Sequence, residues 1–185
     1  MKSVLISVQP KWVEKIASGE KTIEVRKTRP KLETPFKSYI YCTTKGYEKV
    51  FYVDKFMHKA FLNVKGRGKV IGEFVCDSIE MVNAKCSDYG IDLFYHDCMA
   101  QGCLTEREIE KYFNIPEDKD LRVMKGNGYA WHISDLKIYD KPKELSEFST
   151  YAYNSEYTVK DGSKYSRVIV NPLKRPPQSW CYVEV

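Results

Sequence analysis

Apolar positions near the N-terminus change their spacing within a short stretch of chain. The run SVLISV at residues 3–8 is mostly apolar and predicts a strand, which Gln9 and Pro10 end. Apolar residues then recur at helical spacing behind Pro10, a residue that suits the first turn of a helix, and Gly19 follows as a C-terminal cap. A short helix is therefore predicted from about Pro10 to Ser18.

The next stretch, KTIEVRK at residues 21–27, alternates apolar and polar side chains. A period of two predicts a strand with one polar face, on which Glu24 and Arg26 lie about 7 Å apart along the chain. On a solvated surface such a pair contributes little to stability, and Lys21 is then merely hydrated. Beside a cleft, the same pair would hold a fixed geometry and leave Lys21 at the strand entrance to meet a ligand.

The rest of the chain continues with β-rich runs and one clear helix signal. The expected strands are 37–43, 49–56, a long strand at 69–82 with a bend or bulge at Gly72, a strand within 126–140, and late strands at 168–170 and 179–185. Thr105 and Glu108 form a capping box that predicts a helix over 104–113, whose apolar stripe packs in the core.

These elements predict an α+β fold that is mainly β, with about six strands and a few short helices in a single domain over residues 1–185. A C-terminal strand that pairs with the early strands would close a small barrel and remove exposed sheet edges. The polar, tyrosine-dotted segment near 148–167 is expected to be a surface loop or a loose hairpin.

Composition narrows the class of protein. A chain that is 43% hydrophobic and 30% charged, with no run of about 18 apolar residues and no signal peptide, is expected to be cytoplasmic, with no membrane partner. The six cysteines then predict reduced thiols rather than a disulfide framework. Cys86, His96, Cys98 and Cys103 are close in sequence but lack a tight C-x-x-C pair, so we expect packing and free thiols there rather than metal, and no cofactor.

The net charge of +5 is unevenly distributed along the chain. Residues 1–75 hold 16 Lys or Arg against 7 Asp or Glu, whereas residues 76–147 hold 9 against 15. A basic first segment favours a polyanion such as RNA, although charge alone slightly favours the alternative, a scatter of solvated lysines. The cations that could track a nucleic-acid backbone are Lys11, Lys27, Arg29, Lys31, Lys65, Arg67 and Lys69.

The helix followed by Gly19, Lys21, Glu24 and Arg26 on the next strand forms a G-x-K-x-x-E-x-R motif that resembles the signature of the ASCH domain family, relatives of the PUA domains of RNA-modifying proteins. The later stretches GKVIGEF, GYAWHISDLKIYDKP and PPQSWCYVEV also resemble this family. The resemblance implies a β-barrel with helices at its ends and a cleft beside the motif for RNA or a modified nucleoside.

One branch of the family contains amidohydrolases that deacetylate cytidine acetylated on its exocyclic amine. The resemblance assigns Lys21 to the lysine of that branch, whereas Glu24 stands where its members have a threonine. A further catalytic glutamate is matched best by Glu73 on a predicted strand.

Three functions follow from these residues. The first is an RNA- or nucleotide-binding module, in which Lys21, Glu24 and Arg26 form the cleft with Lys11, Arg29, Trp131 and His132 around it, Trp12 and Trp180 being further stacking candidates. The second is an amidohydrolase of a modified nucleoside, in which Lys21 is nucleophile or base and Glu24 or Glu73 moves a proton. The third is a protein that binds a partner without catalysis. Oligomeric state is not predicted.

Overall fold

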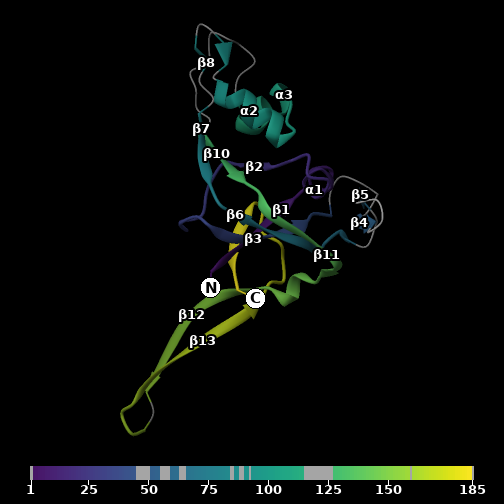
Figure 1. Ribbon diagram of the computed structural model, residues 1–185. Coiled ribbons are helices and arrows are strands. Elements are labelled where there is room, and N and C mark those ends of the chain that lie inside the picture. Colours follow the sequence, from purple (N-terminus) through teal and green to yellow (C-terminus); the bar gives the residue numbers. More distant parts are fainter. Residues whose placement is uncertain are drawn as a thin grey trace.

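The computed structural model describes residues 2–44, 51–54, 59–62, 66–83, 86–87, 90–91, 93–114, 127–158 and 160–184 (Figure 1). Their helices are α1 (Pro10–Ala17), α2 (Leu93–Gly102), α3 (Glu106–Phe113) and the 3-10 helix η3 (Leu145–Glu147). Their strands are β1 (Ser3–Val8), β2 (Ile23–Arg26), β3 (Phe36–Cys42), β4 (Phe51–Asp54), β5 (Lys59–Leu62), β6 (Val70–Cys76), β7 (Ile79–Asn83), β8 (Cys86–Ser87), β9 (Gly90–Ile91), β10 (Asn127–His132), β11 (Ser134–Lys143), β12 (Ser149–Thr158), β13 (Lys164–Pro172) and β14 (Trp180–Val183).

A five-stranded sheet in the order β11-β6-β3-β1-β14 forms the centre of the molecule. β1 pairs in parallel with β3 and antiparallel with β14, so the C-terminal strand returns beside the first strand as predicted. The two ends of the chain consequently lie next to each other (Figure 1). Every residue of β1 is buried, which explains why its sequence is a nearly continuous apolar run rather than an alternating one.

A smaller sheet in the order β2-β10-β7 lies beside the first. One antiparallel ribbon runs through both sheets, because β6 pairs with β11 in the large sheet while β7 pairs with β10 in the small one. The long strand predicted over 69–82 is therefore two strands, and the break lies at Asp77 and Ser78. The backbone N–H of His132 donates to the Ser78 carbonyl at 3.0 Å and holds the ribbon together where it bends.

The predicted closed barrel is not found among the described strands. β11 and β14 end the large sheet, and β2 and β7 end the small one, so strand pairing does not join the two sheets into a barrel among the described strands. The described part of the chain also has fourteen strands in five sheets, more than the six expected, because the break at Asp77 and Ser78 divides one long run and because β4–β5, β8–β9 and β12–β13 form further two-stranded sheets. The mainly β, α+β class is confirmed.

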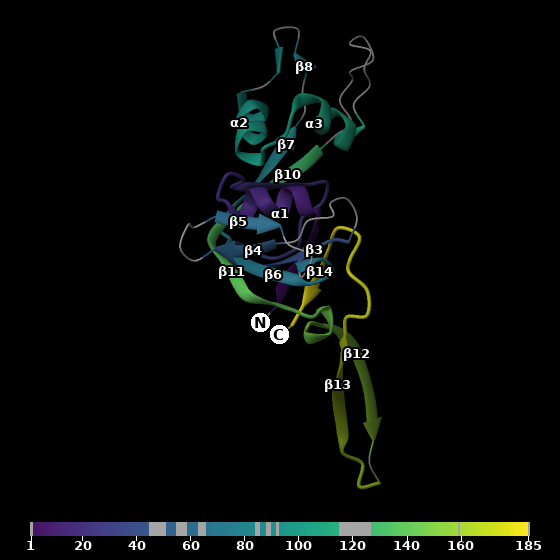
Figure 2. The same cartoon turned by 90° about the vertical axis from the view of Figure 1, so that its right-hand side faces the viewer.

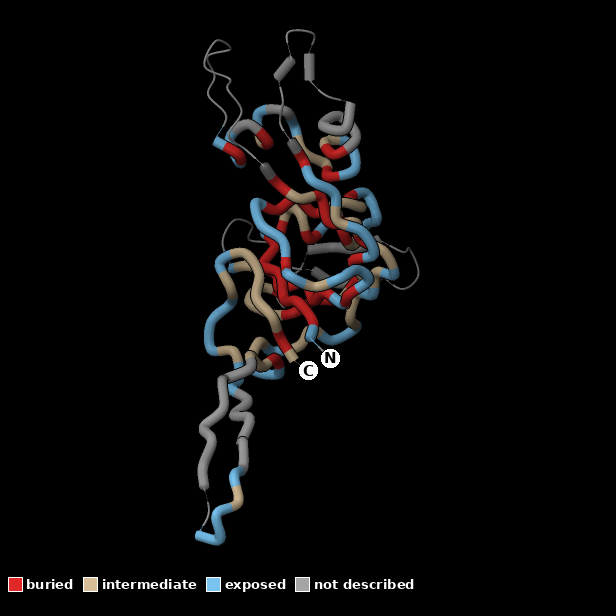
Figure 3. Tube along the Cα trace, turned by 90° about the vertical axis from the view of Figure 1, so that its left-hand side faces the viewer, coloured by how far each residue is buried: buried red, intermediate tan, exposed pale blue. Residues whose placement is uncertain are grey.

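Three apolar clusters hold the layers together. Val13 and Ile16 of α1 pack with Val4 and Ile40 on one face of the large sheet, while Phe148 helps to cover the other face. A third cluster joins α2 and α3 to the small sheet (Figure 2). Most of the buried residues in the described part of the chain accordingly lie in the middle of the molecule (Figure 3).

Local sequence signals account for several element ends. The prediction that α1 is capped by Gly19 is confirmed, since Gly19 has a φ of +79° and its N–H donates to Ile16 at 3.0 Å. The capping box of α3 is present, with Thr105 N–H donating to Glu108 at 3.0 Å. The register of β3 and β6 shifts next to Gly72, where an added Cβ would lie 2.5 Å from the Lys137 carbonyl oxygen.

The segment expected as a surface loop or loose hairpin is the two-stranded hairpin of β12 and β13, which projects from the body (Figure 1). Its pairing runs from Ser149–Pro172 to Thr158–Lys164, so it extends beyond the expected end at residue 167. Helices long and apolar enough to cross a membrane do not occur among the residues described.

Candidate functional site: a cavity around Lys21, Glu24 and Arg26

The turn after α1 brings the motif onto a paired strand. The backbone N–H of Lys21 donates to the Lys15 carbonyl at 2.9 Å, which folds the chain back before β2 begins. In β2, Glu24 lies opposite Trp131 of β10, and Arg26 lies opposite Tyr129. The two charged residues are thus two positions apart on one face of the strand, as the alternation predicts.

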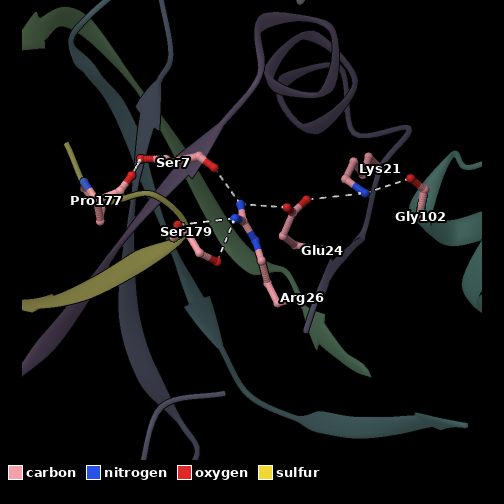
Figure 4. A network of polar contacts seen from close by, with 7 residues as sticks. All are labelled: Ser7, Lys21, Glu24, Arg26, Gly102, Pro177 and Ser179. Atoms are coloured by element: carbon pink, nitrogen blue, oxygen red, sulfur yellow. Dashed lines mark hydrogen bonds and ion pairs between the residues drawn. The ribbon is translucent and has the colours of Figure 1, made fainter. Parts of the chain in front are cut away.

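The three charged motif residues form a buried chain of contacts (Figure 4). Glu24 Oε1 lies 2.8 Å from Arg26 Nη2, and Glu24 Oε2 lies 3.4 Å from Lys21 Nζ. Lys21 Nζ also donates to the Gly102 carbonyl at 2.7 Å. The side chains are only 2% (Lys21), 8% (Glu24) and 8% (Arg26) exposed, so one carboxylate faces two buried cations and the group carries one excess positive charge.

Arg26 is also a clamp between segments that are distant in sequence (Figure 4). Its Nη2 donates to the Ser7 carbonyl at 2.8 Å, and its Nη1 donates to the carbonyl and hydroxyl oxygens of Ser179 at 3.2 and 3.3 Å. With Glu24, these contacts engage all four terminal N–H groups of the guanidinium. Its Nε is buried and has no partner among the described residues.

These side chains line a cavity of about 790 Å³. Lys21, Glu24 and Arg26 form its charged wall, and Trp12, Leu104 and Tyr112 contribute apolar and aromatic surface. Among the described lining residues, five side chains are cationic, namely Lys11, Lys21, Arg26, Lys27 and Lys111, and two are carboxylates, those of Glu24 and Glu108. The volume is within the range of small-molecule sites, and the charge balance favours an anionic or electron-rich ligand.

An ion pair between two helices crosses one side of this cavity. Lys11 of α1 lies 2.6 Å from Glu108 of α3, and its Nζ is 4.0 Å from the centre of the Trp12 ring. Burial acts to raise the pKa of Glu108, but hydrogen bonds from Lys11 and Thr105 outweigh it, so the net pKa is lowered. Lys21 Nζ lies 5.3 Å from the same Trp12 ring, which places this indole between the helix pair and the charged wall.

Comparisons with known proteins decide the fold. No family model matches the sequence, and no curated protein matches it either. A crystal structure of ASCH from Zymomonas mobilis matches over 98% of this chain and 87% of that chain, with 18% identity and a TM-score of 0.57. A tyrosine-to-phenylalanine variant of the Zymomonas mobilis protein matches over 100% of this chain and 91% of that chain, with 17% identity and a TM-score of 0.54.

A serine-to-alanine variant of the same protein matches over 98% of this chain and 88% of that chain, with 17% identity and a TM-score of 0.58. The chain has the ASCH fold. The resemblance inferred from the motif is therefore confirmed at the level of fold, and at these identities the likeness concerns the fold alone.

Within this ASCH fold, several predicted site residues lie outside the cavity. Trp131 is fully buried between Phe36 and Trp180, with ring centres 6.0 Å from each, so it has no free face for stacking. His132 Nδ1 lies 2.6 Å from Asp77 at the surface, and that contact lowers the pKa of Asp77. Neither Trp131 nor His132 lines the cavity.

Glu73 also lies elsewhere in the ASCH fold. Its carboxylate is 3.0 Å from Lys37 and accepts a hydrogen bond from Tyr139 at 2.5 Å, and it does not line the cavity around Lys21.

Among the predicted rim cations, Lys11 lines the cavity around Lys21, Arg29 and Lys31 line a neighbouring one, and Lys27 lines both. Lys69 pairs with Glu144, the Arg67 Nε is buried without a described partner, and Lys65 lies outside the described residues.

The cysteine cluster is described only in part. Cys98 is buried, which raises the pKa of its thiol to about 11, and Cys103 donates to the Glu20 carbonyl at 3.3 Å. The side chains of Cys86 and His96 lie outside the described part of the chain. Groups of three or more potential metal ligands do not occur among the residues described.

Sequence reasoning missed the hydroxyl and amide side of the cavity. Ser7, Gln9, Thr43, Gln178 and Ser179 line it, and the Thr43 hydroxyl is buried without a partner in the described chain. They converge only because β1, β3 and the segment before β14 meet at one end of the sheet. The signal in the sequence is weak: polar residues lie at or next to the ends of three predicted strands.

Proposed function

We propose that the cavity around Lys21, Glu24 and Arg26 binds a nucleobase, either as a nucleotide or as one residue of single-stranded RNA. The observation that carries the proposal is the adjacency of Lys21 and Glu24, a donor and an acceptor 3.4 Å apart on the wall of a cavity of about 790 Å³. The edge of a base offers the complementary pair, an acceptor next to an N–H donor. Two groups at this spacing fit such an edge better than they fit a single phosphate.

The hydrogen-bonding capacity of the two side chains supports this role. An ammonium group has three N–H donors, and the contacts of Lys21 with Gly102 and Glu24 account for two of them. Each carboxylate oxygen of Glu24 contacts one cation among the described residues and keeps a further lone pair. One N–H donor of Lys21 and a lone pair on each oxygen of Glu24 are therefore left for a ligand, whereas the terminal N–H groups of Arg26 are engaged by the protein.

The remaining surfaces of the cavity suit the other parts of a nucleotide. Trp12 and Tyr112 offer aromatic faces for stacking. The exposed cations Lys27 and Lys111 lie on the same cavity and can meet a phosphate. A purely structural ion-pair network would be closed by its own partners, but this one opens onto a cavity lined with excess positive charge.

Titration calorimetry tests the proposal with the four common nucleoside monophosphates and a single-stranded RNA of about eight nucleotides. Lys21→Met removes the free donor while keeping the side-chain length, and we expect it to weaken binding about tenfold or more. Lys15→Met is the matched control, because Lys15 is a half-exposed lysine of the preceding helix α1 that pairs with Glu20 and does not line the cavity. RNA affinity should also fall steeply with salt.

Two results would contradict the proposal. One is the absence of binding to all of these ligands by the unmodified protein. The other is a Lys21→Met protein that binds as well as the Lys15→Met protein, since the proposed donor would then have no role.

A second candidate is hydrolysis of an acylated nucleoside, and the geometry at Lys21 favours it. A neutral amine that donates its two N–H groups to Gly102 and Glu24 would direct its lone pair along the third tetrahedral direction. As a base, Nζ would take a proton from water while the water oxygen adds to the acyl carbon, and the proton would then pass to the departing amine nitrogen. Glu24 is the neighbouring carboxylate for this chemistry, because Glu73 lies outside the cavity.

Incubation with cytidine acetylated on its amine, followed by chromatography of the released cytidine, tests this candidate. Turnover is expected to disappear in Lys21→Met and to persist in Lys15→Met. Turnover that survives Lys21→Met removes the mechanism, and a protein that binds the compound without turnover retains only the binding function.

A further inference from the structure

A second cavity of about 630 Å³ adjoins the first. It is lined by the loop of residues 27–33, which follows β2, and by Tyr129 of β10. Lys27 lines both cavities, so the two are neighbours on the surface. We call this second cavity the loop subsite.

The loop is fixed in place by strand β14. The indole Nε1 of Trp180 donates to the Thr28 hydroxyl at 2.9 Å, and the backbone N–H of Lys31 donates to the Tyr182 hydroxyl at 2.7 Å. The two aromatic rings of β14 pack edge to face, 5.4 Å apart. Pro30, between these two anchors, is buried. A loop held at two points presents its side chains in a preformed arrangement, which lowers the entropic cost of binding.

The chemistry of the subsite combines positive charge with an aromatic ring. Lys27, Arg29 and Lys31 are exposed cations, and Glu33 is the one carboxylate among the described residues that line it. The Arg29 guanidinium lies 5.9 Å from the centre of the Tyr129 ring. Cations that neutralise phosphate, next to rings and guanidinium planes on which bases stack, are the two components of single-strand recognition.

We propose that the loop subsite holds the nucleotide next to the one whose base occupies the cavity around Lys21, so that the ligand is a single-stranded oligonucleotide rather than a free nucleotide. This inference rests on the proposed function. Lys27, shared by both cavities, lies where the linking phosphate would pass. An acidic peptide would satisfy the cations, but it would use neither the Tyr129 ring nor the adjoining base cavity.

The test compares a single nucleotide with an oligonucleotide on one pair of variants. Arg29→Gln combined with Lys31→Gln removes two cations of the loop subsite, and Lys137→Gln combined with Lys141→Gln is the matched control. The control residues are exposed on β11, at the opposite edge of the large sheet from β14. Binding of cytidine monophosphate and of a fluorescent single-stranded RNA of about eight nucleotides is measured over a salt series.

We expect the loop variant to bind the RNA about tenfold more weakly at low salt, with a salt slope shallower by about 1.4, since each lost phosphate contact contributes roughly 0.7 on a single strand. Its affinity for cytidine monophosphate should stay within about twofold of the unmodified protein, because neither cation lines the base cavity. Tyr129→Leu should weaken RNA binding by a further fivefold or so without changing the salt slope.

Each other outcome has a defined meaning. If the loop variant and the control bind RNA with equal affinity, the loop subsite is overturned. Loss of binding to both cytidine monophosphate and RNA in Lys21→Met would still support the cavity around Lys21 as the base site. RNA binding that needs the loop cations but survives Lys21→Met contradicts the proposed function and leaves a general polyanion surface. Equal competition by a polyglutamate peptide overturns the assignment to nucleic acid.

Discussion

Glu24 and Glu73 are the two glutamates that the sequence offers for catalysis, and each contacts a lysine and one further donor. Glu24 contacts Lys21 and Arg26, whereas Glu73 contacts Lys37 and Tyr139. The Lys21 side chain is 2% exposed, but the Lys37 side chain is 46% exposed. Similar partners thus make a buried charged wall in one place and a half-solvated surface contact in the other.

The difference shows what distinguishes a candidate site from an ordinary ion pair. The Glu24 group has one more cation than carboxylate, is almost completely removed from water and opens onto a cavity. Charges in such surroundings are strong toward a ligand because little solvent screens them. The Glu73 group is charge-balanced and borders neither of the two cavities described above, so its contacts serve the sheet.

The largest expected effect comes from neutralising each glutamate in turn. Glu24→Gln leaves Lys21 and Arg26 buried without their counter-charge, and we expect the free energy of unfolding to fall by about 3–5 kcal/mol. Glu73→Gln should lower it by less than about 1 kcal/mol, because Lys37 can turn to solvent. Denaturant unfolding at neutral pH measures both, and equal losses would contradict the contrast between the two groups.

The second-largest expected loss of stability distinguishes the charge of Arg26 from its hydrogen bonds to Ser7 and Ser179. Arg26→Lys keeps the positive charge beside Glu24 but loses the contacts with Ser7 and Ser179, so we expect a loss of roughly 1–3 kcal/mol. Arg175→Lys, at an exposed position of the segment before β14, is the control and should change stability by a few tenths of a kcal/mol at most.

Proteolysis adds a local measurement to the same pair of variants. If the Arg26 clamp holds the segment before β14, trypsin should cut after Lys174 faster in Arg26→Lys than in the unmodified protein. An unchanged cleavage rate together with unchanged stability would show that the charge alone of Arg26 matters.

Local sequence patterns correctly predicted those features that depend on residues close together in the chain, namely strand faces and helix ends. Alternation placed Glu24 and Arg26 on one face, and the glycine and capping-box signals located the ends of α1 and α3. The partners that bury the motif could not be predicted in this way. Gly102 is 81 residues from Lys21, and Ser179 is 153 residues from Arg26. Only the tertiary arrangement brings them together.

The strand bend explains the misplaced candidates. Reading residues 69–82 as one strand leaves no reason to separate Glu73 from the motif, yet the break at Asp77 and Ser78 puts β6 and β7 in different sheets. Glu73 therefore lies in the large sheet, while Glu24 lies in the small one. Trp131 is similarly ambiguous, since an apolar residue of an alternating strand can face a core or a ligand, and here neighbouring rings bury it.

The smallest expected effect tests the surface group by pH. Burial acts to raise the pKa of Glu73, but hydrogen bonds from Tyr139 and Lys37 more than offset it, so the net pKa is lowered. A carboxylate with a lowered folded-state pKa contributes stability above its unfolded pKa of about 4.3, and this contribution is lost as the pH falls through the folded value. Tyr139→Phe removes one donor and should cost about 0.5–1.5 kcal/mol at pH 7 and less at acid pH.

Tyr182→Phe is the matched control for that measurement. The Tyr182 hydroxyl accepts a hydrogen bond from a backbone N–H rather than donating to a carboxylate, so its loss should cost a similar amount at both pH values. Unfolding at pH 7 and at about pH 3, below the usual pKa of a glutamate, therefore separates the two tyrosines. If the stability lost in each variant is the same at both pH values, Tyr139 does not stabilise the charged form of the Glu73 carboxylate. The Glu73 and Glu24 groups would then share only the types of residue that they contain.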